Sequence, residues 1–303
     1  MKQLLAWLLW ITAIIGLSSV ILFSTLFFFL RSSLPEYNKT VGLEGLTSEI
    51  EIVRDTANIP HIFGKTDATT IFGLGYVHAQ DRLWQMTMLR RTAQGRLSEI
   101  FGQNKLKSDI LIRRLGVYEA ARNSVLALTP EIRELLESYT AGVNARLSEI
   151  NANSLGRGAP EFFLFSNSIA AWSPADSLAI LKLIGLQQSN HLQSEILRAR
   201  VSLVLGEKRV KDILPDVPGT GVAELASFAS SFSMTSKKEQ NLLKQPLSLP
   251  PLKNINLSGA SNAWAAAPGR SAVNGTLLAN DPHTTLTAPS QWYLARLDLA
   301  SGA

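Results

Sequence analysis

The sequence predicts a chain of the mixed α/β (α+β) class, helical through its middle and with strands on either side. Three observations support this class. Residues 48–55 alternate between polar and apolar side chains, as in a half-buried strand. Residues from about 66 to 204 carry successive apolar patterns with helical spacing, and the apolar run that begins near residue 261 is again strand-like.

The composition is that of a globular protein, with 46% hydrophobic and 17% charged residues in 303. The net charge of +5 is dispersed along the chain, which argues against a nucleic-acid-binding surface. The absence of cysteine excludes disulfides, thiolate nucleophiles and cysteine-based zinc sites from this chain. The four histidines are widely scattered, so we expect no histidine-rich metal site.

An uncharged apolar segment lies at the N-terminus, from Leu4 to Leu30. As a helix, its ~27 residues would span ~40 Å, enough to cross a ~30 Å hydrocarbon core with some tilt. The segment lacks the short apolar core and small-residue exit of a cleavable signal peptide. We therefore interpret residues 1–31 as a membrane anchor and residues 32–46 as a polar tether, with a signal sequence and a buried helix as the alternatives.

The region 47–213 is expected to hold two short strands followed by helices. Residues 48–55 and 61–63 are the predicted strands, joined by a turn at Asn58-Ile-Pro60. Thr66 and Asp67 can cap a helix that runs to about Gln94 and ends near Gly95. Further helices are predicted over residues 108–126, 129–150 and 173–204. The last of them starts with Ser173 as its cap and Pro174 in its first turn.

Residues 214–260 have a different character, with several prolines and glycines and a serine-rich stretch. This composition favours a flexible loop. A loop of ~45 residues is unusual inside a compact domain unless it has a purpose. We interpret it as a spacer that is excised, and an ordinary surface linker is the alternative.

Ser261 follows two small residues, Gly259 and Ala260, at the junction between this spacer and the strand-like region 261–303. Cleavage of the Ala260–Ser261 bond would give the serine a free α-amine, which can act as its general base without a distant histidine. The ordinary α-amine pKa of ~7.7–8.0 suits that role. Taken alone, the same residues also fit an ordinary turn.

Two separate blocks of sequence resemble penicillin acylases, which are N-terminal-nucleophile (Ntn) hydrolases. Ser261-Asn-Ala-Trp-Ala265, a Gly-Arg-Ser turn and Leu277-Leu-Ala-Asn-Asp-Pro-His283 are similar to the start of the family's catalytic β chain. The second block resembles the family's α chain. It comprises Val53-Arg-Asp55, Ile59-Pro-His-Ile62, Gly75-Tyr-Val-His-Ala-Gln-Asp-Arg-Leu-Trp84, Arg91 to Glu99, Pro160 to Phe165 and Ala171 to Leu178.

The resemblance implies an αββα sandwich in the full-length protein, of which this chain supplies mainly the helical α chain and the first β-chain strands. It implies a precursor that cleaves itself before Ser261 and then hydrolyses the acyl amide bond of penicillin-like or other N-acyl substrates. His283 would orient or hydrogen-bond the nucleophile, and a structural histidine at the end of a strand is the alternative. Glu195 would be one carboxylate of a calcium site, whose other ligands are not found in this chain; a surface glutamate paired with Arg198 or Arg200 is the alternative. No organic cofactor is implied.

Several alternatives stay open. The substrate could be an acyl-homoserine lactone, and the chain could instead be a non-catalytic α-chain remnant or a membrane-anchored binding protein. Because only residues 261–303 stand in place of a long β chain, we expect an inactive fragment. The parent protein is expected at the inner membrane, facing the periplasm or the cell exterior, with its own α and β chains as partners and no nucleic acid.

Overall fold

A computed structural model describes residues 2–43, 46, 48–152, 158–165, 169–188, 201, 209, 261–282 and 286–302. The described part is mostly helical, with two small sheets. The chain divides into two compact units: residues 1–182 together with 287–303, and residues 183–286. The predicted mixed class is confirmed in this coarse form, and each unit is described separately below.

The first helix, α1 (Lys2–Ser32), is uniformly apolar. An 18-residue window within Gln3–Ser32 has a mean hydropathy of 2.4, and none of it is buried against the rest of the protein. Its length and composition are those of a membrane-crossing helix, although a signal sequence near the N-terminus has the same properties. Among the described residues it is the one helix with this character.

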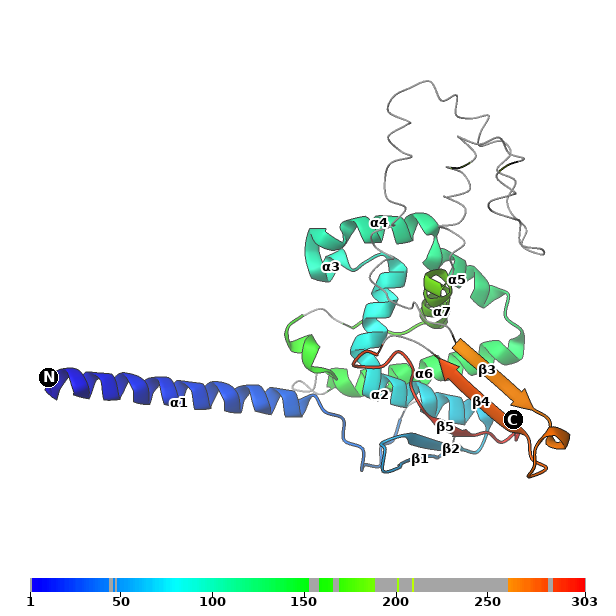
Figure 1. Cartoon of the computed structure of the whole chain (residues 1–303), viewed down its shortest axis with the longest axis horizontal. Coiled ribbons are helices and arrows are strands. Elements are labelled where there is room, and N and C mark those ends of the chain that lie inside the picture. Colours follow the sequence, from blue (N-terminus) through cyan, green and yellow to red (C-terminus); the bar gives the residue numbers. More distant parts are fainter. Residues whose placement is uncertain are drawn as a thin grey trace, which may run out of the picture. The chain divides into compact units, whose positions relative to one another are not determined.

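A three-stranded sheet contains β1 (Ile50–Arg54), β2 (Pro60–Gly64) and β5 (Arg296–Asp298). β1 pairs antiparallel with β2, and β2 pairs parallel with β5, so that His61 is opposite Arg296 and Phe63 is opposite Asp298. The strands far apart in sequence thus lie side by side in one unit (Figure 1). The two N-terminal strands agree with the predicted pair, whereas β5 joins them from the far side of the spacer.

Helix α2 (Asp67–Gln94) packs on this sheet and has well-formed caps at both ends. Thr66 and Thr69 form a reciprocal capping box at its start, and Gly95 ends it with a φ of 62°, which glycine adopts at little steric cost. The predicted helix 66–94 is therefore confirmed. Arg82 has non-helical dihedral angles (φ −132°, ψ 15°), so the helix is kinked there.

Helix α6 (Pro130–Ala152) lies against α2 (Figure 1). The backbones touch at two glycines: a Cβ added to Gly75 would lie 2.0 Å from the Tyr139 carbonyl oxygen, and one added to Gly142 would lie 1.9 Å from that of Phe72. Only hydrogen in place of a side chain permits this approach. A core forms beside the contact from Ala79, Leu83, Met86, Val143, Leu147, Ile150, Phe162 and Trp172.

The region between α2 and α6 contains α3 (Ser98–Phe101), the 3-10 turn η1 (Gly102–Lys105), α4 (Leu106–Leu115) and α5 (Val117–Leu126). The single helix expected over 108–126 is therefore two helices. Gly116 separates them with a φ of 65°, a left-handed conformation that ends one helix and begins the next at an angle.

The last helices of the described α region are η2 (Pro160–Phe163), a 3-10 turn, and α7 (Pro174–Gln188). Ser173 and Pro174 begin α7 as predicted. The predicted continuation to residue 204 and the whole spacer 214–260 lie outside the described residues, apart from Val201.

The second unit contains a β-hairpin of β3 (Ser261–Ala266) and β4 (Leu277–Pro282). The strands pair antiparallel over six residue pairs, from Ser261 opposite Pro282 to Ala266 opposite Leu277. The turn η3 (Pro268–Arg270) follows β3. These two strands were expected from the apolar pattern after the spacer.

Candidate functional site

The hairpin places the candidate nucleophile at the start of a strand. Ser261 is the first residue of β3, and its backbone is paired with that of Pro282 at the end of β4. A peptide bond immediately before the first residue of a strand can be cut without breaking the hydrogen bonds between the strand and its partner. This position is compatible with a new N-terminus at Ser261.

The connection between the strands explains why the hairpin closes where it does. Ser271 is buried, and its backbone N–H donates to the Pro268 carbonyl at 3.0 Å. Its hydroxyl accepts a hydrogen bond from the Val273 N–H at 3.3 Å. Asn274 then turns the chain with a φ of 51°, a conformation in which asparagine is enriched. The Gly-Arg-Ser turn of the sequence motif is therefore a defined structural corner.

The other two predicted site residues, His283 and Glu195, lie outside the described residues. His283 immediately follows Pro282, the cross-strand partner of Ser261. Within the described ranges, no group of three or more histidine, aspartate or glutamate side chains could hold a metal ion. The described side chains therefore do not test the predicted calcium site.

In the first unit, Asp81 of α2 collects donors from three separate segments. Arg54 donates to the carboxylate with its two terminal nitrogens at 2.9 and 3.1 Å, and the Tyr37 hydroxyl donates at 3.1 Å. The Tyr293 hydroxyl forms a short hydrogen bond to the second carboxylate oxygen. We call Tyr37, Arg54, Asp81 and Tyr293 the Asp81 junction.

Asp81 and the next residue, Arg82, do not pair with each other, because adjacent residues of a helix point in different directions. Asp81 pairs instead with Arg54, and Arg82 donates to the carbonyl oxygen of Ser290 at 2.7 Å.

The pKa values of the neighbouring aromatic groups reflect their burial. Burial, with a smaller contribution from Asp81, raises the pKa of Tyr293 above its usual range and raises that of Tyr37. Burial lowers the pKa of His78 to about 4, so its ring is neutral near pH 7. His78 is hydrogen-bonded to the Tyr139 hydroxyl at 2.9 Å and packs edge-on against Tyr293. His78 is therefore a packed, neutral histidine.

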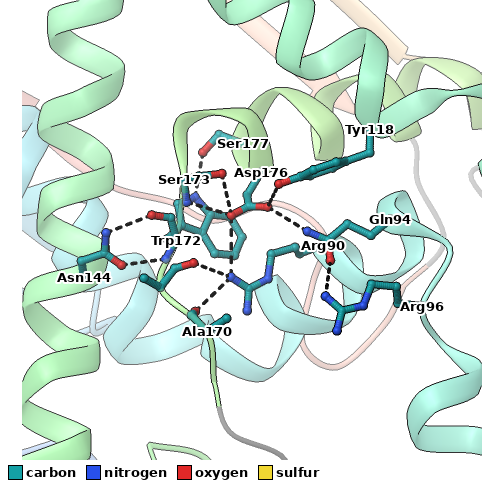
Figure 2. Close-up of polar contacts among 11 residues, drawn as sticks. Arg90, Gln94, Arg96, Tyr118, Asn144, Ala170, Trp172, Ser173, Asp176 and Ser177 are labelled. Atoms are coloured by element: carbon teal, nitrogen blue, oxygen red, sulfur yellow. Dashed lines mark hydrogen bonds and ion pairs between the residues drawn. The ribbon is translucent and has the colours of Figure 1, made fainter.

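A second polar cluster surrounds Asp176 near the start of α7 (Figure 2). One carboxylate oxygen accepts from the Ser173 backbone N–H and hydroxyl, at 2.8 and 3.1 Å, and lies 3.7 Å from Arg90. The other accepts from the Tyr118 hydroxyl at 3.0 Å and the Gln94 amide at 3.2 Å. These donors satisfy the carboxylate, which is typical of a structural buried charge.

The same cluster explains the motif Ala171 to Leu178. Arg90 donates to the carbonyls of Ala170 and Ala171, and its guanidinium lies 5.0 Å from the centre of the Trp172 ring (Figure 2). Asn144 holds the Trp172 backbone through two hydrogen bonds, at 2.7 and 2.9 Å. The motif therefore joins α2, α6 and α7, and it has a structural role.

Sequence reasoning did not find either polar cluster. Each joins residues that are far apart in the sequence; around Asp81, Arg54 is 27 positions away and Tyr293 is 212 positions away. The block that resembles the family's α chain contains Arg54, Asp81 and Asp176 but neither Tyr37 nor Tyr293. The resemblance therefore marks some of the cluster residues without saying which of them meet.

Comparison with known proteins shows which family these features belong to. Residues 49–302 match the family described as penicillin amidase. The chain is 32% identical over 275 residues to penicillin acylase 2 proenzyme of Pseudomonas sp. (strain SE83), covering 87% of this chain and 34% of that protein. It is 32% identical over 281 residues to the acyl-homoserine lactone acylase QuiP of Pseudomonas fluorescens (strain Pf0-1), covering 88% and 32%.

Among solved structures, the chain is similar to a thermostable penicillin G acylase from Alcaligenes faecalis, with a TM-score of 0.45 and 23% identity, covering 55% of this chain and 89% of that one. The chain spans about a third of the length of the curated relatives it matches. The family match extends over most of the sequence and includes both blocks that carry the resemblance. The chain therefore belongs to the penicillin amidase family.

Proposed function

We propose that this chain is part of the precursor of an N-terminal-serine amidohydrolase that is cleaved between Ala260 and Ser261. The observation that carries the proposal is the family match across residues 49–302, which continues through Ser261 and the whole β3–β4 hairpin. A further support is that β3 begins at Ser261 itself. The full-length protein would have the αββα sandwich of Ntn hydrolases.

In the proposed processing step, the Ser261 hydroxyl oxygen attacks the Ala260 carbonyl carbon, and the bond from that carbon to the Ser261 nitrogen breaks. The resulting ester is hydrolysed by water, which leaves a carboxylate on Ala260 and a free amine on Ser261. The small residues Gly259 and Ala260 allow the backbone to bend towards the hydroxyl.

In the proposed catalytic cycle, the freed amine accepts the hydroxyl proton through a water molecule, and the oxygen attacks the acyl carbon of an amide substrate. The amine product leaves, and water then hydrolyses the acyl-enzyme. Backbone or side-chain donors must stabilise each tetrahedral oxyanion. His283 is proposed to orient the nucleophile, supported by its position next to Pro282, the cross-strand partner of Ser261.

The proposed substrates are N-acyl compounds, because the relatives are a penicillin acylase and an acyl-homoserine lactone acylase by name. Calcium is proposed on the family resemblance alone, with Glu195 as one ligand. A site with 6–8 oxygen ligands would need further donors, and no catalytic step depends on it here. We further propose that α1 anchors the enzyme in the inner membrane with its catalytic part outside the cytoplasm, supported by the length and hydropathy of that helix.

The test is the mass and N-terminal sequence of the full-length protein. We expect a new chain that begins Ser-Asn-Ala-Trp. Ser261→Ala should abolish both this chain and amide hydrolysis, whereas Ser258→Ala, three residues upstream, should leave both intact. Processing that persists in Ser261→Ala would contradict the proposal. An unprocessed wild-type protein without hydrolysis would favour a non-catalytic remnant.

A further inference from the structure

Residues 287–302 belong to the same compact unit as residues 2–182, although the spacer and Ser261 lie between them in the sequence. A break in the chain before Ser261 would therefore leave this unit composed of two separate polypeptides. The contacts of residues 287–302 with the N-terminal part then help to hold the two polypeptides together without a covalent connection. These contacts fall into two groups.

The first group surrounds β5. This strand contributes three residue pairs to the sheet, and the Thr70 hydroxyl donates to the Asp298 carbonyl at 3.2 Å. Leu297 packs against the small apolar cluster around Ile62 and Val77. The Ser301 backbone N–H donates to the Asp67 carboxylate at 3.1 Å. A three-residue strand on the edge of a sheet is a short attachment.

The second group of contacts surrounds the Asp81 junction. Asp81 itself is on α2, next to the kink at Arg82. Tyr293 donates its hydroxyl proton to Asp81, and its ring packs edge-on against His78 with the centroids 4.5 Å apart. The carboxylate is held by Arg54, and the side chains of the pair are only 10% and 13% exposed. A hydrogen bond to a charged acceptor with little access to water is stronger than one between neutral groups.

Arg82 and Gln85 strengthen the same contact. Both donate to the Ser290 carbonyl oxygen, at 2.7 and 3.2 Å, and the Arg82 guanidinium lies 5.5 Å from the centre of the Tyr293 ring. One turn of α2 thus binds residues 287–302 in two ways, through the backbone carbonyl of Ser290 and through the side chain of Tyr293.

We propose that Asp81 is the anchor that retains residues 287–302 on α2 after the chain has been cut. Asp81 would keep the two pieces assembled, because its carboxylate accepts one hydrogen bond from Tyr37 of the N-terminal piece and one from Tyr293 of the C-terminal piece. The biological importance of the anchor rests on the proposed cleavage before Ser261, but the contact and its test do not.

The test uses the 303-residue chain in detergent. It carries the Ser261→Ala substitution, a protease site inserted between residues 214 and 258, and an N-terminal affinity tag. Added protease makes the cut, so the result does not depend on self-processing. The immobilised protein is washed, and the C-terminal piece that remains is measured over time by mass spectrometry. Circular dichroism of each uncut variant checks that it folds.

We expect the unsubstituted chain to retain its C-terminal piece and Tyr293→Phe to lose it roughly tenfold faster, the scale of one hydrogen bond to a charged group. Tyr37→Phe is the matched control, since it removes the same kind of bond to the same carboxylate from the N-terminal piece. It should release at nearly the unsubstituted rate. Asp81→Asn is the second variant and should release at least as fast as Tyr293→Phe.

Three results would overturn the anchor. One is immediate release from the unsubstituted chain. Another is retention in both Tyr293→Phe and Asp81→Asn, which would assign the binding to β5. The third is equally fast release from Tyr37→Phe and Tyr293→Phe. Failure of the proposed function has a different signature, namely an uncut chain in the full-length protein that carries Ser261.

Discussion

At the residue scale, burial determines how the charged groups of this chain are used. Arg90 and Asp176 form the most deeply buried ion pair recorded among the described residues, with side chains 7% and 3% exposed. Burial lowers the pKa of Arg90, and Asp176 opposes this effect. Such a pair contributes little net stability, but the loss of one partner leaves an unpaired buried charge.

Asp176→Asn is therefore expected to lower the free energy of unfolding by about 3–5 kcal/mol, because Arg90 stays charged while its acidic partner is lost. Denaturant unfolding followed by circular dichroism measures this change.

Glu119→Gln provides the comparison. Glu119 forms an ion pair with Arg122 on the surface of α5, where the two side chains are 65% and 63% exposed. Loss of an exposed pair should change the free energy of unfolding by less than about 1 kcal/mol. Equal effects of the two substitutions would show that the cluster around Asp176 is not a structural centre.

At the element scale, the contact between α2 and α6 depends on two glycines that face backbone atoms of the other helix. Gly75 lies against Tyr139, and Gly142 lies against Phe72 and Tyr76. Because backbone atoms cannot rotate away as a side chain can, an added methyl group must separate the helices. The polar side chains on α2 are thereby kept in place relative to the sheet.

Gly142→Ala should accordingly lower the free energy of unfolding by about 3 kcal/mol, at the upper end of the usual cost of overpacking. Thermal or denaturant unfolding gives the value. Gly185→Ala in α7 is the matched control, since no atom of the described residues lies within 4 Å of the added methyl group.

At Gly185 the better helix propensity of alanine should raise helix stability by roughly 0.5–1 kcal/mol. A neutral effect of Gly142→Ala would mean that the two helices are not in backbone contact. The opposite signs expected at the two positions separate close packing from helix propensity.

At the scale of the whole molecule, α1 would lie in lipid in the proposed enzyme, whereas the remaining chain would lie in water. The exposed side chains of this helix are almost all large and apolar, including Trp7, Leu22 and Phe23 at about 70% exposure. An apolar surface of this size is unfavourable in water and is covered readily by lipid.

Deletion of residues 2–32 from the full-length protein should move it from the membrane fraction to the soluble fraction, because the apolar helix is the proposed anchor. Fractionation and immunoblotting measure this. Replacement of residues 34–43 by a Gly/Ser segment of equal length should leave the protein in the membrane.

A mature chain that begins after residue 31 would identify the helix as a cleaved signal sequence instead. Intact-mass measurement of the membrane-extracted protein distinguishes the two outcomes. An uncleaved soluble protein would contradict both.

Much of this organisation can be predicted from the sequence because it depends on local properties. Apolar spacing predicted α2 between Thr66 and Gly95, and the Ser173-Pro174 cap predicted the start of α7. The break at Gly116 was missed, since an isolated glycine is tolerated in many helices. The family was predicted correctly from ordered motifs and is confirmed. The roles of Ser261, His283 and Glu195 stay predictions.

By itself, the sequence determined the helices α2 and α6, the start of α7, the first two strands, the strand character after the spacer and the family. Only the tertiary structure decided that β5 pairs with β2 and that Asp81 binds Arg54 and Tyr293. The physical reason is range. Caps and apolar periodicity act within a few residues, whereas a buried carboxylate takes whichever donors the folded backbone brings to it.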